Sequence, residues 1–183
     1  MLIKNPDLVL EHASQFAEKL RGLRYAEDVP VEMAIHSPGR PVGYAEAVKG
    51  KYRPLKEGTV FKDMWARHWV KVAGTVPKAW AGSEVVLIFE HDGEALVWQD
   101  GAPLQSIINT SWVTPDYVGP IRPYCRLVKK AKGGERVSCL VEMACCAFWG
   151  YLVQPFRGSP EVRQFPLRRV RLVRLDPQAW ALW

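Results

Sequence analysis

The chain has 183 residues, which is enough for one well-buried domain and too few for two comfortable ones. Hydrophobic residues make up 48% of it and eight residues are tryptophan, so a disordered or low-complexity chain is excluded. The formal net charge of +6 raises the question of nucleic-acid binding, which depends on how the cationic residues are distributed.

The first predicted element is a helix close to the N-terminus. Asn5 can cap it, Pro6 suits its first turn, and Asp7 interacts favourably with the positive end of the helix dipole. Apolar residues then recur at helical spacing between Leu8 and Leu23. We therefore expect a helix with one apolar stripe over these residues.

Turn-forming residues dominate the stretch from 28 to 56, which follows the predicted helix. Prolines and glycines recur along it, among them Pro30, Pro38, Gly39, Pro41, Gly43 and Pro54. This composition is typical of an irregular segment and predicts an arm rather than a core element. We expect residues 1–57 to form the helix and this extended arm, and residues 58–183 to form the main domain.

The main domain is predicted to consist of short strands. Asp100-Gly101 is a hairpin signal, and β-branched or alternating apolar patterns predict strands at residues 68–72, 84–90, 95–98, 136–143 and 170–175. Many short strands with one leading helix indicate a mainly β fold. We expect an antiparallel β-sandwich of the jelly-roll or galactose-binding-like type, with an N-terminal α-helix.

The sequence contains no recognisable catalytic or metal-binding pattern. The four histidines lie far apart, whereas a zinc site usually contains one close pair of ligands. No phosphate-binding glycine loop and no nucleophile elbow is found. Cys145 and Cys146 are flanked by apolar residues, which favours buried and unreactive thiols. We expect no catalytic residue, no metal ligand and no cofactor in this chain.

Tryptophan side chains are the best candidates for a ligand-binding role. An indole ring can stack on the apolar C–H face of a sugar, but most tryptophans of a small sandwich belong to its core. Trp69, Trp80 and Trp98 fall where core is predicted. Trp65 and Trp112 lie near predicted loops, so they are the candidate carbohydrate-binding residues.

Two C-terminal features are candidates for contact with a partner protein. Arg168, Arg169 and Arg171 alternate with apolar residues, a pattern that indicates a strand with a solvated or partner-facing cationic side. A phosphate-binding surface needs convergence from several elements, so nucleic acid is not the expected partner. Trp180 and Trp183 place apolar surface near the end of the chain, where it would dock on another protein.

The expected location of the protein is the cytoplasm. The first residues lack the long apolar run of a secretion signal, and no stretch is long and apolar enough to span a membrane. The four cysteines show no spacing typical of a disulfide framework.

A series of short motifs in residues 44–105 resembles the N-terminal domain of family-38 α-mannosidases of the cytosolic and vacuolar branch. The motifs occur in the same order as in that family: Tyr44–Val48, Tyr52–Pro54, His68–Val72, Val76–Trp80, Asp92–Trp98 and Asp100–Gln105. The resemblance implies a jelly-roll domain packed on a zinc-dependent catalytic barrel that removes α-linked mannose from free oligosaccharides. In relatives the zinc ligands and the nucleophile lie in that barrel, so no catalytic residue is carried over to this chain.

Three readings of the function remain open at this point. The chain is either the accessory domain of an α-mannosidase, which supports the catalytic domain or the assembly of the enzyme, or a stand-alone binding or scaffold subunit derived from that domain. Cys146-Ala147 replaces the Asn-Gly of relatives, a change that favours the second reading. A carbohydrate-binding module, which would bind a mannosyl oligosaccharide, is a third reading and requires exposed aromatic residues.

Overall fold

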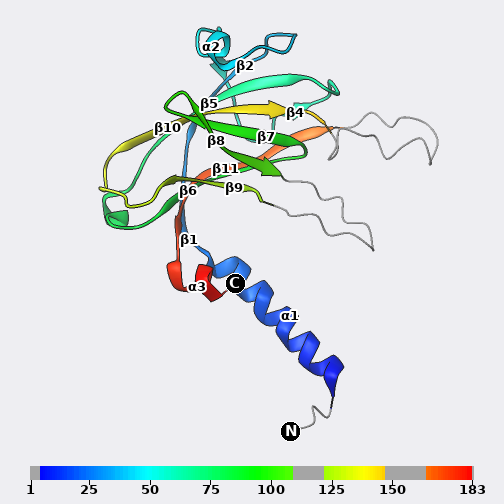
Figure 1. Cartoon of the computed structure of the whole chain (residues 1–183), viewed down its shortest axis with the longest axis vertical. Coiled ribbons are helices and arrows are strands. Elements are labelled where there is room, and N and C mark those ends of the chain that lie inside the picture. The colour runs from blue at the N-terminus through cyan, green and yellow to red at the C-terminus, as the bar shows by residue number, and fades with distance from the viewer. Residues whose placement is uncertain (1–4, 109–121, 147–163, 183) are drawn as a thin grey trace, which may run out of the picture.

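The computed structural model describes residues 5–108, 122–146 and 164–182, and within them two antiparallel sheets face each other (Figure 1). Sheet 1 has the strand order β1-β11-β6-β9, and β4 pairs with the start of β11. Its strands are β1 (Tyr25–Pro30), β4 (Val60–Phe61), β6 (Val85–His91), β9 (Tyr124–Val128) and β11 (Phe165–Leu175).

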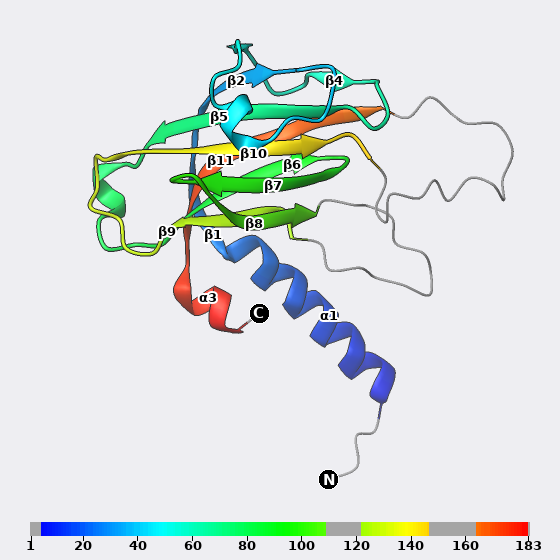
Figure 2. The same ribbon diagram turned by 45° about the horizontal axis from the view of Figure 1, so that its top comes forward.

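Sheet 2 has the strand order β3-β2-β5-β10-β7-β8. Its strands are β2 (Glu32–His36), β3 (Arg53–Pro54), β5 (Arg67–Thr75), β7 (Glu94–Gln99), β8 (Ala102–Ile108) and β10 (Arg136–Ala144). Figure 2 shows β10, β7 and β8 side by side on one side of the sandwich. The predicted antiparallel β-sandwich is confirmed.

The core lies between the two sheets and follows from the alternation of side chains along each strand. Val70 and Val72 of β5 and Val141 and Met143 of β10 face inward, because alternate residues of a strand point to the same side. They meet buried side chains of sheet 1, including Leu87, Phe89, Leu167 and Val170. The continuous apolar run of β6 has a separate cause: Val86 and Ile88 are buried on the outer side of sheet 1, under the C-terminal segment.

Residues 25–36 are part of the sandwich, although residues 28–36 were expected to belong to an irregular arm. They form β1 in sheet 1 and β2 in sheet 2. β1 pairs with β11 along its length, and β2 pairs with β5 from Glu32 to His36. The chain therefore passes from one sheet to the other at Val31. Pro30 is compatible with this position because β1 is an edge strand, where a missing backbone N–H breaks no ladder. A boundary at residue 57 would divide the sandwich.

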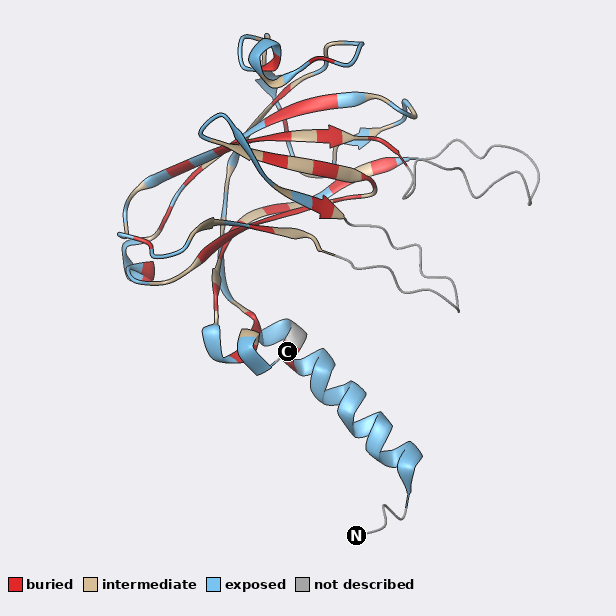
Figure 3. Ribbon diagram, in the orientation of Figure 1, coloured by how far each residue is buried: buried red, intermediate tan, exposed pale blue. Residues whose placement is uncertain are grey.

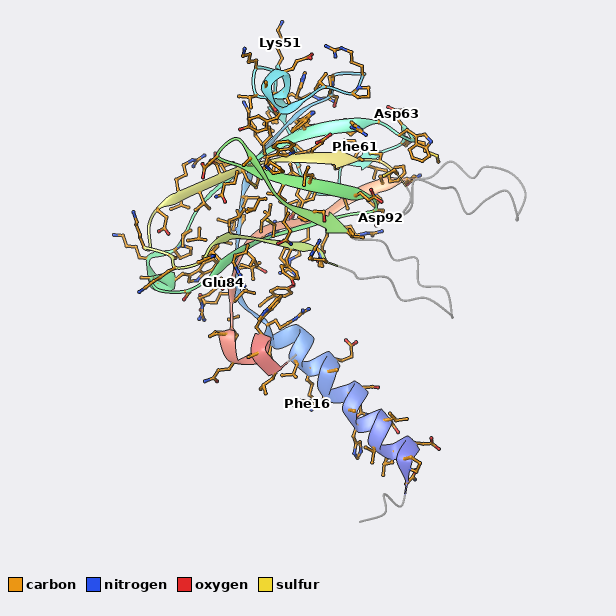
Figure 4. All side chains as sticks on the ribbon, in the orientation of Figure 1. Phe16, Lys51, Phe61, Asp63, Glu84 and Asp92 are labelled. Atoms are coloured by element: carbon orange, nitrogen blue, oxygen red, sulfur yellow. The ribbon has the colours of Figure 1, made fainter. Side chains whose placement is uncertain are left out.

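Helix α1 (Pro6–Leu23) confirms the predicted N-terminal helix. Asn5 caps it by accepting a hydrogen bond from the Leu8 N–H at 3.3 Å. The helix contacts the rest of the domain at its C-terminal end, where it meets α3 (Pro177–Leu182) and β1. Figure 3 shows nearly all of α1 in the colour of exposed residues. Leu20 is buried, whereas Phe16 is 58% exposed (Figure 4).

Two short helical segments complete the described structure. α2 (Tyr44–Ala47) covers part of the outer side of sheet 2, where Val42 and Ala47 pack on Trp69 and Leu140. The 3₁₀ helix η1 (Lys78–Trp80) inserts Trp80 between the sheets' ends, as the sequence predicts. Its indole N–H donates a hydrogen bond to Glu27 at 2.8 Å. Among the described helices, none is sufficiently long and apolar to cross a membrane.

Candidate functional site

A groove of about 400 Å³ lies on the outer side of sheet 2, beside the part that α2 covers. Four strands contribute to it: β5, β10, β7 and β8. The lining side chains that point outward are Arg67, Glu94, Leu96, Ser106, Ile108, Glu142 and Ala144.

Strand register explains why these residues meet. One row across the sheet runs from Arg67 through Ala144 and Glu94 to Ile108. The adjacent row runs from Trp69 through Glu142 and Leu96 to Ser106. Residues between these rows along each strand, such as Met143 and Ile107, point into the core because the side-chain period of a strand is two.

The groove combines an apolar floor with charged sides. Leu96 and Ala144 form the floor, and Glu94 and Glu142 flank it. Arg67 Nη1 lies 3.4 Å from Glu142 Oε1, at the long limit of a hydrogen bond. The Arg67 side chain is 50% exposed and that of Glu142 is 19% exposed.

Two further groups border the charged residues. Arg122 Nη2 donates to the Ser106 hydroxyl at 2.8 Å, and its Nε donates to the Ser106 carbonyl. Cys146 lies beside Glu94, and both burial and this carboxylate raise the pKa of the Cys146 thiol. The thiol is therefore protonated at neutral pH. The groove can offer acceptors, donors and apolar contact to a small ligand.

An aromatic cluster lies on the same side of sheet 2 as the groove but does not line it. Trp69 is buried, and Trp98 lies 6.1 Å from it between ring centroids. Tyr44 of α2 stacks on Trp98 with 5.0 Å between ring centroids. The predicted packing roles of Trp69 and Trp80 are confirmed, and Trp98 packs against the same cluster as Trp69.

Of the two tryptophans predicted to bind carbohydrate, Trp65 does not line the groove. Trp65 is 53% exposed and lies in the turn before β5, with φ at +67°. Its backbone N–H donates to the Cys145 carbonyl, which holds the turn against the end of β10. Trp112 lies outside the described residues. A role of either residue in sugar binding stays a prediction.

The arginines of β11 are paired with carboxylates of the same domain. Arg168 binds Asp92 at 2.7 Å, and Arg169 binds Asp28 at 2.6 Å. Arg171 contacts Glu57, which also accepts a hydrogen bond from a backbone N–H of β11. These ion pairs connect β11 to β1, to the turn after β6 and to Glu57. Its contact with a partner protein stays a prediction.

Trp180 packs on its own domain rather than standing free. Its ring meets Tyr124 of β9 edge-to-face, with 4.9 Å between centroids. The guanidinium of Arg24 lies 5.3 Å from the Trp180 ring centroid. This contact fixes α3 on the outer side of sheet 1. Trp183 lies outside the described residues, so the interface predicted for Trp180 and Trp183 remains untested.

His91 and the cysteines occupy the interior. Burial lowers the pKa of His91 to about 4, so its ring is neutral at neutral pH. Burial raises the pKa of Cys145 to about 12, in keeping with the unreactive thiol that the sequence predicts. Within the described ranges no three His, Cys, Asp or Glu side chains meet in a group that could hold a metal ion.

The family model and the curated relatives that match this chain all point to the α-mannosidases. A family model described as "Alpha-mannosidase, jelly roll domain" matches residues 29–173. Human alpha-mannosidase 2C1 is 33% identical over 160 residues, which are 84% of this chain and 14% of that protein. Alpha-mannosidase G of Dictyostelium discoideum is 26% identical over 161 residues, again 14% of its length. The chain thus spans a small part of these relatives.

Solved structures support the fold. A beta-glucuronidase from Ruminococcus gnavus superposes with a TM-score of 0.51 over 82% of this chain and 28% of that chain. The sequence identity is 11%, so this similarity concerns the fold alone.

Proposed function

Since this chain belongs to the α-mannosidase jelly roll domain family, we propose that it serves as the non-catalytic N-terminal β domain of an α-mannosidase. The observation that carries the proposal is the extent of the match. The family model covers 29–173, most of this chain, whereas the 160 residues aligned with human alpha-mannosidase 2C1 are only 14% of that protein. A domain of this kind supports a catalytic part or the assembly of the enzyme.

Helix α1 offers a surface for such a partner. Val9, Phe16 and Leu23 are spaced by seven residues, so they lie on one side of the helix, and all three are exposed. Most of the stability of a helix in a protein comes from the packing of its apolar side, so a partner that covers this side of α1 would stabilise it. We infer that the catalytic part of the enzyme, on the same or another polypeptide, covers this side.

The proposal extends to substrate and location. The relatives are named α-mannosidases, so the enzyme supported by this domain would act on α-mannosides, in line with the free oligosaccharides that the family resemblance implies. All four cysteines are free and buried, a state that suits a reducing compartment and supports a cytoplasmic location. Zinc finds no fitting set of ligands among the described residues, and the proposal assigns this chain no part in the chemical step.

The test is native mass spectrometry of the tagged chain purified from its own cells. We expect the catalytic part of an α-mannosidase in stoichiometric amount, either as a separate polypeptide or within the same polypeptide as the tagged chain. Phe16→Asp places a charge on the exposed apolar side of α1 and should reduce the bound fraction at least about tenfold. Ser14→Asp is the matched control, because it adds the same charge to the opposite side of the same helix and should leave the complex intact.

Two results would count against the proposal. A different stoichiometric assembly without any mannosidase would favour the stand-alone binding or scaffold subunit. Equal loss of the complex in Phe16→Asp and Ser14→Asp would show that α1 does not make the contact through its apolar side.

A further inference from the structure

We propose that the groove on the outer side of sheet 2 binds one neutral sugar ring, as a non-catalytic carbohydrate site of this domain. The site is formed by Arg67, Glu94, Leu96, Ser106 and Glu142. The choice of a sugar as ligand rests on the proposed function, because the family to which the chain belongs is named for enzymes that act on mannosides.

The dimensions of the groove suit a small ligand. Its volume of about 400 Å³ lies at the lower end of the range for small-molecule sites, which is roughly 300–1,000 Å³. The neighbouring part of the same sheet face is covered by Val42, Tyr44 and Ala47. The covered part and the groove are adjacent on the sheet, because Trp69 pairs with Glu142 in the register of β5 and β10.

The chemistry of the groove matches the two sides of a pyranose. A sugar ring presents apolar C–H groups on its faces and hydroxyl groups at its edge. Leu96 and Ala144 supply apolar contact from the floor, while the carboxylates of Glu94 and Glu142 can each accept hydrogen bonds from adjacent hydroxyls. Hydrogen bonds to charged groups are the stronger ones, so few are needed for orientation.

Arg67 and Glu142 retain hydrogen-bonding capacity for a ligand. Their 3.4 Å contact is longer than the 2.7 Å contact of Arg168 with Asp92 and the 2.7 Å contact of Arg174 with Glu27. A guanidinium has five N–H donors and a carboxylate can accept about four hydrogen bonds, so a single long contact leaves most of this capacity open. Hydroxyl groups can bridge the pair without breaking it.

The charge balance selects among sugars. The groove contains two carboxylates, Glu94 and Glu142, and one guanidinium, Arg67. Arg122, which borders the groove at Ser106, brings the formal charge of the surroundings to zero, so the site offers no net attraction to an anionic sugar such as a sugar phosphate or a uronate, whose charge would have to be desolvated beside two carboxylates. A neutral hexose has no such penalty. No aromatic ring lines the groove among the described residues, so we expect weak binding, in the millimolar range.

The experiment is a titration of the 183-residue chain with methyl α-D-mannopyranoside, followed by ¹H–¹⁵N NMR. Saturable shifts are expected for backbone amides near Glu94, Leu96 and Glu142. Glu142→Gln should weaken binding at least about tenfold, because an uncharged amide replaces one of the two charged acceptors. Glu32→Gln, on β2 of the same sheet and outside the groove, is the matched control and should bind as the unchanged chain does. Thermal unfolding of both variants confirms that they are folded.

Three results would overturn the site. They are the absence of saturable shifts, shifts centred on Trp65 instead of the groove, and binding that Glu142→Gln leaves unchanged. Methyl α-D-glucopyranoside and glucuronate serve as further probes, and tighter binding of glucuronate would contradict the charge argument. The outcome is independent of the co-purification test. A chain that binds the mannoside but has no mannosidase partner would support the sugar site and contradict the proposed function. A chain that has a mannosidase partner but does not bind the mannoside would support the proposed function and contradict the sugar site.

Discussion

Gly93 and His91 illustrate, at the scale of single residues, how tightly the turn between β6 and β7 is packed. A Cβ atom on Gly93 would lie 2.3 Å from the Ala144 carbonyl oxygen and 2.9 Å from the His91 ring. His91 is itself buried, with its Nε2 lacking a hydrogen-bond partner in the described structure. Asp92, which follows it, holds Arg168. The turn at Asp92-Gly93 joins β6 of sheet 1 to β7 of sheet 2.

Substitution of Gly93 by alanine should destabilise the domain. The new methyl group would force the backbone of β10 or the His91 ring to move, at a cost of about 2 kcal/mol or more. Gly43→Ala is the control, because a Cβ there meets nothing within 4 Å, and its effect should stay within about 1 kcal/mol. Urea unfolding of both variants measures the difference, and equal free energies of unfolding would contradict the packing argument.

His91 should make the domain less stable in mild acid. Its pKa is lowered by burial to about 4 in the folded chain, against 6.5 when exposed. As the pH falls below 6.5 the unfolded chain binds a proton that the folded chain does not, so stability decreases, by up to about 3 kcal/mol near pH 4. The free energy of unfolding of His91→Gln should fall less steeply with decreasing pH. Identical slopes in the two proteins would refute this assignment.

At the scale of elements, β11 shows that ion pairs within the domain can neutralise a segment that is basic in sequence. Its arginines alternate with buried residues such as Val170 and Leu172, and they bind Asp28, Glu57 and Asp92 from three other segments. These carboxylates neutralise the positive charge of the arginines, which would otherwise attract a phosphate backbone. The net charge of +6 is thus a poor guide to the potential at this strand.

The chain should therefore bind DNA poorly. Fluorescence anisotropy with a labelled duplex of about 20 base pairs, at about 0.15 M salt, should give a Kd above about 100 µM. Arg168→Glu replaces a neutral ion pair with two carboxylates, so it should only weaken this binding further. Micromolar binding that Arg168→Glu abolishes would restore the nucleic-acid interpretation.

At the scale of the whole molecule, β1 and β2 hold the two sheets together. β1 covers one edge of sheet 1 through β11, and β2 extends sheet 2 through β5. The single residue between them, Val31, packs against the core. Helix α1 has no comparable role, because most of its length is exposed.

Two truncations separate these contributions. A chain that lacks residues 1–17 keeps Leu20 and both strands, so it should fold and unfold cooperatively on heating. A chain that lacks residues 1–36 exposes the edges of β11 and β5 and should aggregate or lose cooperative unfolding. Circular dichroism and light scattering distinguish the outcomes. Cooperative unfolding of the chain that lacks residues 1–36 would show that β1 and β2 are not needed for the fold of the sandwich.

The sequence by itself determined the type of fold, the family and the fate of several residues. Alternation in 68–72 and the apolar run in 84–90 follow from the local geometry of half-buried and buried strands, so they are readable without a structure. Cys145, Trp80 and the α1 cap were predictable for the same reason, since their neighbours along the chain set their environment. Ordered motifs along the chain identified the family.

Only the tertiary structure decided where residues 25–36 belong and which side chains form the groove. β1 pairs with a strand about 140 residues away, as the Arg169–Asp28 contact illustrates, and its acidic residues and proline weaken the local strand signal. Arg67 and Glu142 are 75 residues apart in sequence and meet through the register of β5 and β10. Local patterns report burial and period, whereas register between distant strands depends on the packing of the whole sandwich.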